Sequence, residues 1–313
     1  MPEVDPDLRS ALRRVQRMPV PPLEWAWARR ILRLALAAAP TGMDGTGVTV
    51  EQPQGPVPGV RVFAPSGPRG DGALLWVHGG GYVLGAARMD DRLCATAARA
   101  LRMVVVSAEY RLAPEHPFPA GLDDCAAAWQ WVQDSAATLG VDPRRVAVGG
   151  QSAGGGLAAA LCQRLHDEGG SVPAAQWLFC PMLDDRTAAR RELDPVGHAV
   201  WDNRRNRYGW TSYLGQEPGA ATVPPHAVPA RRDDLSGLPP AWIGVGDVDL
   251  FHDESVGYAA RLRAAGVGVE LVVVPGAPHG IVSWAADTRP ARDLVERAHA
   301  WLAAALSAPS YPP

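Results

Sequence analysis

Short apolar runs alternate with alanine-rich amphipathic stretches along most of this chain. Runs of β-branched and apolar residues, bounded by glycine, proline and polar clusters, are typical of strands. They predict eight strands, at residues 47–51, 57–64, 73–78, 103–109, 146–150, 176–180, 241–246 and 269–275. The stretches between the later strands predict helices near residues 88–100, 121–139, 153–167, 253–265 and 287–306.

Strands that alternate with helices predict an α/β fold with one eight-stranded, mostly parallel sheet covered on both faces. The first two strands differ, because only the short segment 53–56 joins them. A connection that short favours an antiparallel hairpin, which we expect at one edge of the sheet.

Two regions fall outside the alternation. Residues 1–45 predict two helices rich in tryptophan and arginine, and residues 183–238 form a long polar stretch that contains several aromatic residues. A loop of that length is usually functional, often a lid. We therefore expect residues 46–182 and 239–313 to form one α/β domain. Residues 1–45 and the insertion 183–238 are expected to pack together as a cap over the carboxyl edge of the sheet.

Composition narrows the functional classes. The 313 residues are 47% hydrophobic with a net charge of -3, which offers no basic field for nucleic acid. All 30 basic residues are arginine, and the absence of lysine excludes Schiff-base chemistry, the lysine-containing phosphate-binding loop and serine–lysine hydrolases. The arginine-rich patches at 190–191, 204–207 and 231–232 are expected to be solvated surface.

The four cysteines are widely spaced and form no C-x-x-C pair, so they indicate neither a zinc site nor a redox motif. Buried thiols in a reducing compartment are the expectation. The apolar segment 31–39 is interrupted by Arg33, and acids as well as bases precede it, which favours an amphipathic helix of a cytoplasmic protein over a signal peptide. No stretch is long enough to span a membrane.

Two glycine-rich motifs follow predicted strands. Gly150-Gln151-Ser152-Ala153-Gly154 is a G-x-S-x-G pattern that lies between a strand and a helix, the context in which a tight turn presents a nucleophilic serine. The run H-G-G-G at 78–81 ends the third strand, and three glycines in succession indicate a backbone that must approach another group closely. Ser152 is therefore the candidate nucleophile.

A serine nucleophile needs a base, which is itself oriented by a carboxylate. His279 is the candidate base, because it follows the last strand at the sheet edge that should carry Ser152. His78 is expected to organise the glycine loop. Five further histidines are expected at the surface, namely His116, His166, His198, His226 and His252.

The acid should follow the strand at 241–246, where Asp247 and Asp249 both lie on the next turn. Spacing alone does not choose between these two. With either one, the chain order of serine, aspartate and histidine is that of an α/β hydrolase.

Five segments together resemble the hormone-sensitive-lipase family of α/β-hydrolase esterases, and the resemblance spans about residues 45 to 306. They are HGGGYVLG, SAEYRLAPEHPFPAGLDD, VGGQSAGGGLAAAL, GDVDLFHDE and PHG. The resemblance implies that Asp249 is the acid. It also implies that the backbone N–H groups of Gly80, Gly81 and Ala153 form the oxyanion hole, and that the N-terminal helices and the insertion build a cap. The chain departs from the family pattern at Gln151 and Ile281.

The expected activity is hydrolysis of small carboxylic esters through an acyl-enzyme, with no metal or organic cofactor. The resemblance implies short- to medium-chain acyl groups. An amidase, lactonase or carbamate hydrolase with the same triad is the near alternative. A ligand-binding protein on the same scaffold is the other, since fold does not prove activity. The exposed last strand makes a homodimer a possible assembly.

Overall fold

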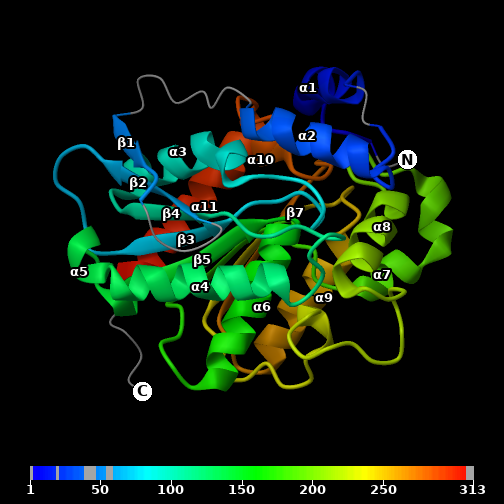
Figure 1. Ribbon diagram of the computed structural model, residues 1–313. Helices are drawn as coiled ribbons and strands as arrows, with labels where there is room; N and C mark the ends of the chain where they lie inside the picture. The colour runs from blue at the N-terminus through cyan, green and yellow to red at the C-terminus, as the bar shows by residue number, and fades with distance from the viewer. Residues whose placement is uncertain (1–2, 19–20, 39–46, 54–58, 308–313) are drawn as a thin grey trace.

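A computed structural model describes residues 3–18, 21–38, 47–53 and 59–307, and it contains one eight-stranded sheet (Figure 1). The strand order is β1-β2-β4-β3-β5-β6-β7-β8. The strands are β1 (Val48–Glu51), β2 (Val60–Pro65), β3 (Ala73–Val77), β4 (Val104–Ala108), β5 (Val146–Gln151), β6 (Gln176–Phe179), β7 (Ala241–Gly246) and β8 (Val269–Val274).

All eight predicted strands form, and the predicted mostly parallel sheet is confirmed. β1 pairs antiparallel with β2, and β2 pairs antiparallel with β4, whereas every other neighbouring pair is parallel. The predicted edge hairpin is therefore present. Most of its connection, residues 54–58, lies outside the described residues.

The five helices predicted between the later strands also form, one of them as the consecutive pair α4 and α5. The α-helices are α1 (Pro6–Gln16), α2 (Ala26–Ala38), α3 (Asp91–Leu101), α4 (Ala120–Asp134), α5 (Ala136–Leu139), α6 (Ala153–Glu168), α7 (Asp185–Ala189), α8 (Asn203–Leu214), α9 (His252–Ala264), α10 (Ile281–Trp284) and α11 (Arg289–Ser307). Four 3-10 turns complete the description, η1 (Ala87–Asp90), η2 (Pro143–Arg145), η3 (Arg191–Val196) and η4 (Pro229–Arg231).

The strands separate two apolar cores because successive side chains of a strand point to opposite faces. In β3, Leu75 and Val77 enter one core, while Leu74 and Trp76 enter the other. Helices α4, α6 and α9 cover the first face, and α3 and α11 cover the second (Figure 1). This burial on both faces explains why the central strands read as continuous apolar runs.

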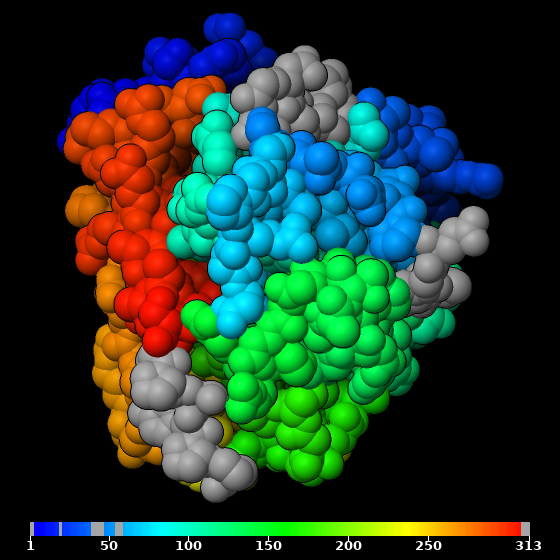
Figure 2. Space-filling view, turned by 90° about the vertical axis from the view of Figure 1, so that its left-hand side faces the viewer, coloured from blue at the N-terminus to red at the C-terminus, as the bar shows by residue number. Residues whose placement is uncertain are grey.

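The N-terminal helices reach two different neighbours. Helix α1 packs against α10 and α11, and Figure 2 shows this first segment in dark blue beside the orange end of the segment that runs on into red along α11. Helix α2 is held through Arg29, whose guanidinium donates to the Tyr208 hydroxyl of α8 at 2.7 Å and to Glu115 at 2.8 Å. Together with a second arginine of α2, Arg33, this contact holds the pKa of Glu115 at about 2 against the opposing effect of its partial burial.

The insertion 183–238 is anchored by polar groups that are buried. The Glu254 carboxylate at the start of α9 accepts hydrogen bonds from the Leu183 amide at 2.7 Å and from the Thr187 hydroxyl at 2.5 Å. Burial raises the pKa of Glu254 well above its ordinary value, although these hydrogen bonds oppose the rise. The expected solvated patch at 231–232 is wrong for Arg231, which pairs at 2.6 Å with the fully buried Asp185. The sequence pattern around Arg231 did not indicate this pair, because Asp185 lies 46 residues away along the chain.

A buried ion pair joins β2, the second strand of the sheet, to α3. The Arg61 guanidinium of β2 donates two hydrogen bonds, of 2.7 and 2.6 Å, to the two carboxylate oxygens of Asp91. Only 9% and 1% of the two side chains are exposed. Such a pair contributes little compared with apolar residues of the same shape, but loss of one partner leaves an unpaired buried charge.

We predict that Asp91→Ala lowers the free energy of unfolding by about 3–5 kcal/mol, because Arg61 then remains buried without its counter-charge. Urea unfolding followed by circular dichroism measures the change. The double variant Arg61→Met, Asp91→Leu serves as the control and should lose less than Asp91→Ala alone. An equal or larger loss in the double variant would contradict this account.

Candidate active site

Ser152 lies on a tight turn between β5 and α6. Its backbone has a φ of 57° and a ψ of -123°, a conformation that residues other than glycine rarely adopt. The turn brings backbone against backbone: a Cβ atom on Gly150 would lie 2.3 Å from the carbonyl oxygen of Gly154, and one on Gly154 would lie 2.1 Å from that of Val77. Side chains at either glycine would therefore push α6 away from the sheet and move Ser152.

Three of the predicted site residues meet at the carboxyl edge of the sheet. His279 Nε2 lies 2.9 Å from Ser152 Oγ, and His279 Nδ1 lies 2.9 Å from one carboxylate oxygen of Asp249. The three side chains are buried, with 4–5% of each residue exposed. They form one continuous hydrogen-bonded chain from a carboxylate through an imidazole to a hydroxyl.

The structure separates the two aspartates that spacing did not distinguish. Asp247 is exposed, and its carboxylate accepts the backbone N–H of Gly276 at 2.6 Å. The Asp249 carboxylate faces His279 and also accepts the Phe251 amide at 2.9 Å. Asp247 thus holds the loop that precedes His279, whereas Asp249 holds the turn after β7, and of the two only Asp249 reaches the imidazole.

The buried carboxylate changes the basicity of the imidazole. Burial by itself lowers the pKa of His279, but the adjacent Asp249 outweighs burial and raises the pKa well above the ordinary value of 6.5. The neutral imidazole remains the form that can accept a proton from Ser152. The site therefore favours a base that is stronger than a free histidine.

The glycine loop runs beside the serine. A Cβ atom on Gly79 would lie 3.1 Å from the Gln151 carbonyl oxygen and 3.5 Å from Ser152 Cβ. Gly80 and Gly81 follow with φ angles of 126° and 60°, and a Cβ on Gly80 would meet the Leu84 carbonyl oxygen at 2.1 Å. Bare backbone is required here because the chain folds back on itself within five residues.

His78 supports this loop from below, in agreement with the expectation that it organises the glycines. Its ring is buried and stacks on Tyr110 with the centroids 4.2 Å apart. Its Nδ1 lies 2.8 Å from the Gly79 carbonyl oxygen. A Cβ on Gly85 would lie 2.5 Å from the same ring nitrogen, so the loop closes tightly around the imidazole.

Trp201 of the insertion covers the glycine loop, although nothing in the sequence distinguished it from Tyr208, Trp210 and Tyr213, the other aromatic residues of that segment. A Cβ atom on Gly81 would lie only 2.2 Å from the Trp201 ring. Trp201 is 9% exposed, and its indole N–H is buried without a hydrogen-bond partner. The preceding residue, Val200, has a φ of 72°, and the Trp201 amide donates to the Ala199 carbonyl oxygen at 2.9 Å. A γ-turn of this hand is strained, above all at a β-branched residue, so the surrounding structure must hold it.

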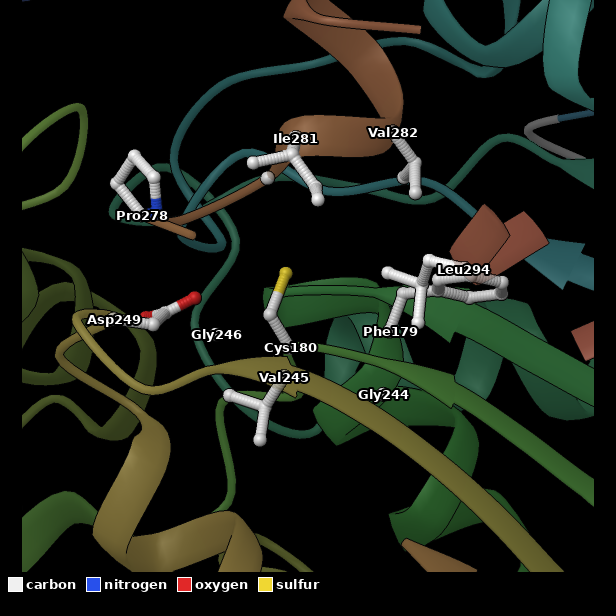
Figure 3. Close-up of a pocket in the computed structure, with 11 residues that line it drawn as sticks. Phe179, Cys180, Gly244, Val245, Gly246, Asp249, Pro278, Ile281, Val282 and Leu294 are labelled. Atoms are coloured by element: carbon white, nitrogen blue, oxygen red, sulfur yellow. The ribbon is translucent and has the colours of Figure 1, made fainter. Parts of the chain in front are cut away.

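A small cavity lies behind the acid, and Figure 3 shows the residues around it. Its volume is about 10 Å³, and Cys180, Asp249, Ile281 and Val282 are among the residues that line it. The two departures from the family pattern lie close by. Ile281 contributes to the cavity wall, and the side chain of Gln151 accepts a hydrogen bond from the Ser283 hydroxyl at 2.9 Å.

Comparisons with known proteins agree with this architecture. A family profile described as the alpha/beta hydrolase fold matches residues 74–283. The carboxylic ester hydrolase LipN of Mycobacterium tuberculosis is 39% identical over 77% of this chain and 65% of that protein. The carboxylesterase NlhH of the same organism is 38% identical over 80% of this chain and 79% of that protein.

A solved structure supports the same relationship. The structure titled bacterial heroin esterase superimposes with a TM-score of 0.85 at 35% identity, and the match covers 98% of this chain and 99% of that one. The similarity therefore extends over the insertion as well as the sheet. From its fold, its matched profile and its relatives, this chain belongs to the hormone-sensitive-lipase-like family of α/β hydrolases.

Proposed function

We propose that this protein is a carboxylic-ester hydrolase that acts through an acyl-enzyme. The observation that carries the proposal is the hydrogen-bonded chain from Asp249 through His279 to Ser152, with distances of 2.9 Å at both links. The names of the relatives, carboxylic ester hydrolase and carboxylesterase, support the same reaction class.

In the proposed reaction, His279 removes the Ser152 proton as the hydroxyl oxygen attacks the ester carbonyl. Asp249 holds the imidazole in position and stabilises its charged form. The imidazolium then protonates the departing alcohol, and the acyl group remains on Ser152. Water, activated by the same His279, releases the acid and restores the serine.

The negative oxygen of the tetrahedral intermediate needs donors that are in place before the reaction. We assign them to the backbone N–H groups of Gly80, Gly81 and Ala153. Ala153 is the first residue of α6, and the first amides of a helix have no partner within it. The positive end of the helix dipole adds to their effect, and one such donor is typically worth roughly 3–4 kcal/mol of the barrier.

The cap belongs to the same proposal. In this proposal the insertion 183–238 and the described part of residues 1–45, with α1 and α2, cover the carboxyl edge of the domain formed by 46–182 and 239–313; residues 39–45 lie outside the described residues. The contact between Arg29 of α2 and Tyr208 of α8 supports a joint cap. Short- to medium-chain acyl esters are the proposed substrates, and the Trp201 indole over Gly81 limits the room beside the oxyanion site.

Two further proposals concern location and assembly. A cytoplasmic location is supported by Cys94, Cys125, Cys162 and Cys180, which are all free and buried. A homodimer through β8 is supported by its place at the end of the sheet order, where β7 is its one strand neighbour among the described residues. In the described part of the chain, no helix has both the length and the apolar character needed to cross a bilayer.

We predict that Ser152→Ala abolishes the pre-steady-state burst of p-nitrophenol from p-nitrophenyl butyrate and lowers kcat by at least about 10⁴-fold. The wild type should show a burst proportional to enzyme concentration. Stopped-flow absorbance measures both quantities on folded protein. Turnover by the variant at the wild-type rate would reject Ser152 as the nucleophile. Cleavage of anilides but not of esters by the wild type would move the assignment to an amidase.

We predict that kcat/KM rises with pH through one ionisation whose midpoint lies above 6.5. The direction follows because the raised pKa keeps His279 protonated, and unable to act as a base, to a higher pH. Initial rates over a pH series measure the midpoint. Asp249→Asn removes the charge that stabilises the imidazolium, so its residual activity should rise at a lower pH. A wild-type midpoint below 6.5 would be inconsistent with this site.

We predict that Trp201→Ala shifts the chain-length preference toward longer acyl esters, by roughly 10-fold in the ratio of kcat/KM for octanoate to acetate. The reason is that the indole then no longer fills the space above Gly81. Activity on p-nitrophenyl esters of increasing chain length measures the ratio. Trp27→Ala, at a 57% exposed tryptophan of α2, is the control and should leave the ratio unchanged. An unchanged ratio in Trp201→Ala would show that the indole does not limit the acyl site.

A further inference from the structure

A thiol lies next to the acid and the base of the proposed triad. Cys180, Asp249 and His279 are all buried, and one potential ligand atom from each lies within 4.8 Å of the other two. Within the described ranges this is the one cluster of three histidine, cysteine or acidic side chains with such spacing. The reaction proposed above makes no use of Cys180.

The backbone directs this thiol toward the triad. Cys180 follows the end of β6, and its amide donates to the Gly244 carbonyl oxygen at 2.6 Å. Its φ of 34° is unusual for a residue with a side chain. In Figure 3 the sulfur of Cys180 and the carboxylate of Asp249 point into the same cavity, below Ile281.

The three donor types are those that zinc prefers, namely a thiolate sulfur, an imidazole nitrogen and a carboxylate oxygen. A tetrahedral ion with bonds of about 2.0–2.3 Å holds its ligand atoms about 3.3–3.8 Å apart. The present separations of up to 4.8 Å require only small side-chain movements to reach that spacing. The cavity of about 10 Å³ has room for roughly one water as the fourth ligand.

We propose that Cys180, Asp249 and His279 form a reversible inhibitory site for a thiophilic divalent cation such as Zn²⁺. Binding forms a metal–sulfur bond and releases the thiol proton to solvent. The imidazole donates one ring nitrogen to the ion and keeps its single proton on the other. Neither nitrogen can then accept the Ser152 proton, so the cation blocks the base.

The other three cysteines lie outside this cluster. Cys94, Cys125 and Cys162 are fully buried, and none of them belongs to the group formed by Cys180, Asp249 and His279. Cys162, on α6, is the matched control because it is buried and free like Cys180 but lies outside the cluster.

The site itself is tested without turnover. Co²⁺ is titrated into the Ser152→Ala variant, which keeps all three ligands. We expect one equivalent of Co²⁺ to bind, with a sulfur-to-cobalt charge-transfer band and the intense visible absorption of tetrahedral cobalt. Addition of Zn²⁺ should displace the Co²⁺ and abolish both absorptions. Adding Cys180→Ser should remove the charge-transfer band, whereas adding Cys162→Ser should retain it. No saturable binding, or a band that survives both Cys180→Ser and Cys180→Ala, overturns the proposal.

The inhibition is tested on active enzyme, and this part alone rests on the proposed function. Zn²⁺ should inhibit ester hydrolysis by the wild type, and EDTA should restore it. The activity of each variant is expressed as a fraction of its own rate without Zn²⁺. On that scale Cys180→Ser should raise the half-inhibitory Zn²⁺ concentration by roughly 10-fold or more over the wild type, since even the loss of a residue that only supports a metal ligand lowers metal affinity by that much. An equal sensitivity in Cys180→Ser and Cys162→Ser would place the inhibition elsewhere. Cobalt binding without any esterase activity would instead reject the proposed function and leave the metal site standing.

Discussion

The position of Ser152 depends on how closely the ends of β3 and β5 and the start of α6 approach one another. At Gly150 and Gly154 the space for a side chain is already occupied by backbone atoms 2.1–2.3 Å away. The helix can begin directly after the serine only because neither residue has a Cβ. That approach forces Ser152 into its strained conformation and directs its hydroxyl away from the sheet, toward His279.

The remaining groups of the site are positioned relative to that turn. Neighbouring parallel strands end at the same edge, so the loops after β3, β5, β7 and β8 meet there although they are far apart in sequence. Ser152 and His279 are separated by 127 residues and are 2.9 Å apart. Gly246 has a similar role at β7, since a Cβ there would lie 1.7 Å from the Ala277 carbonyl oxygen and would displace the loop that carries His279.

The insertion 183–238 reaches the glycine loop through Trp201 and is held in place by a different physical means. Its apolar side chains, Trp210 and Tyr213 among them, join the first core of the sheet domain rather than forming a core of their own. Buried polar contacts, such as those of the Glu254 carboxylate with Leu183 and Thr187, add to this anchoring. The same segment carries the strained turn at Val200, which is followed directly by the Trp201 ring over Gly81. In the proposed reaction the groups that react therefore lie at the edge of the sheet, whereas Trp201, which is proposed to limit the acyl site, comes from an insertion in which no strand is described. Because these two sets of residues lie on different segments, substitutions in the insertion can change the shape of the pocket without moving the groups that react.

Local pattern was sufficient for the sheet, its helices, the serine turn and the glycine loop, because hydrophobic period and glycine placement report on neighbours within a few residues. The family resemblance pointed to Asp249, whereas the spacing of Asp247 and Asp249 did not separate them. Only the tertiary structure distinguished them physically, placed Trp201 over Gly81 and brought Cys180 to the acid and the base. The tertiary structure also paired Arg231 with the buried carboxylate of Asp185. Each of these depends on side chains that meet from different strands, loops or helices, and close packing between distant segments has no periodic signature along the chain.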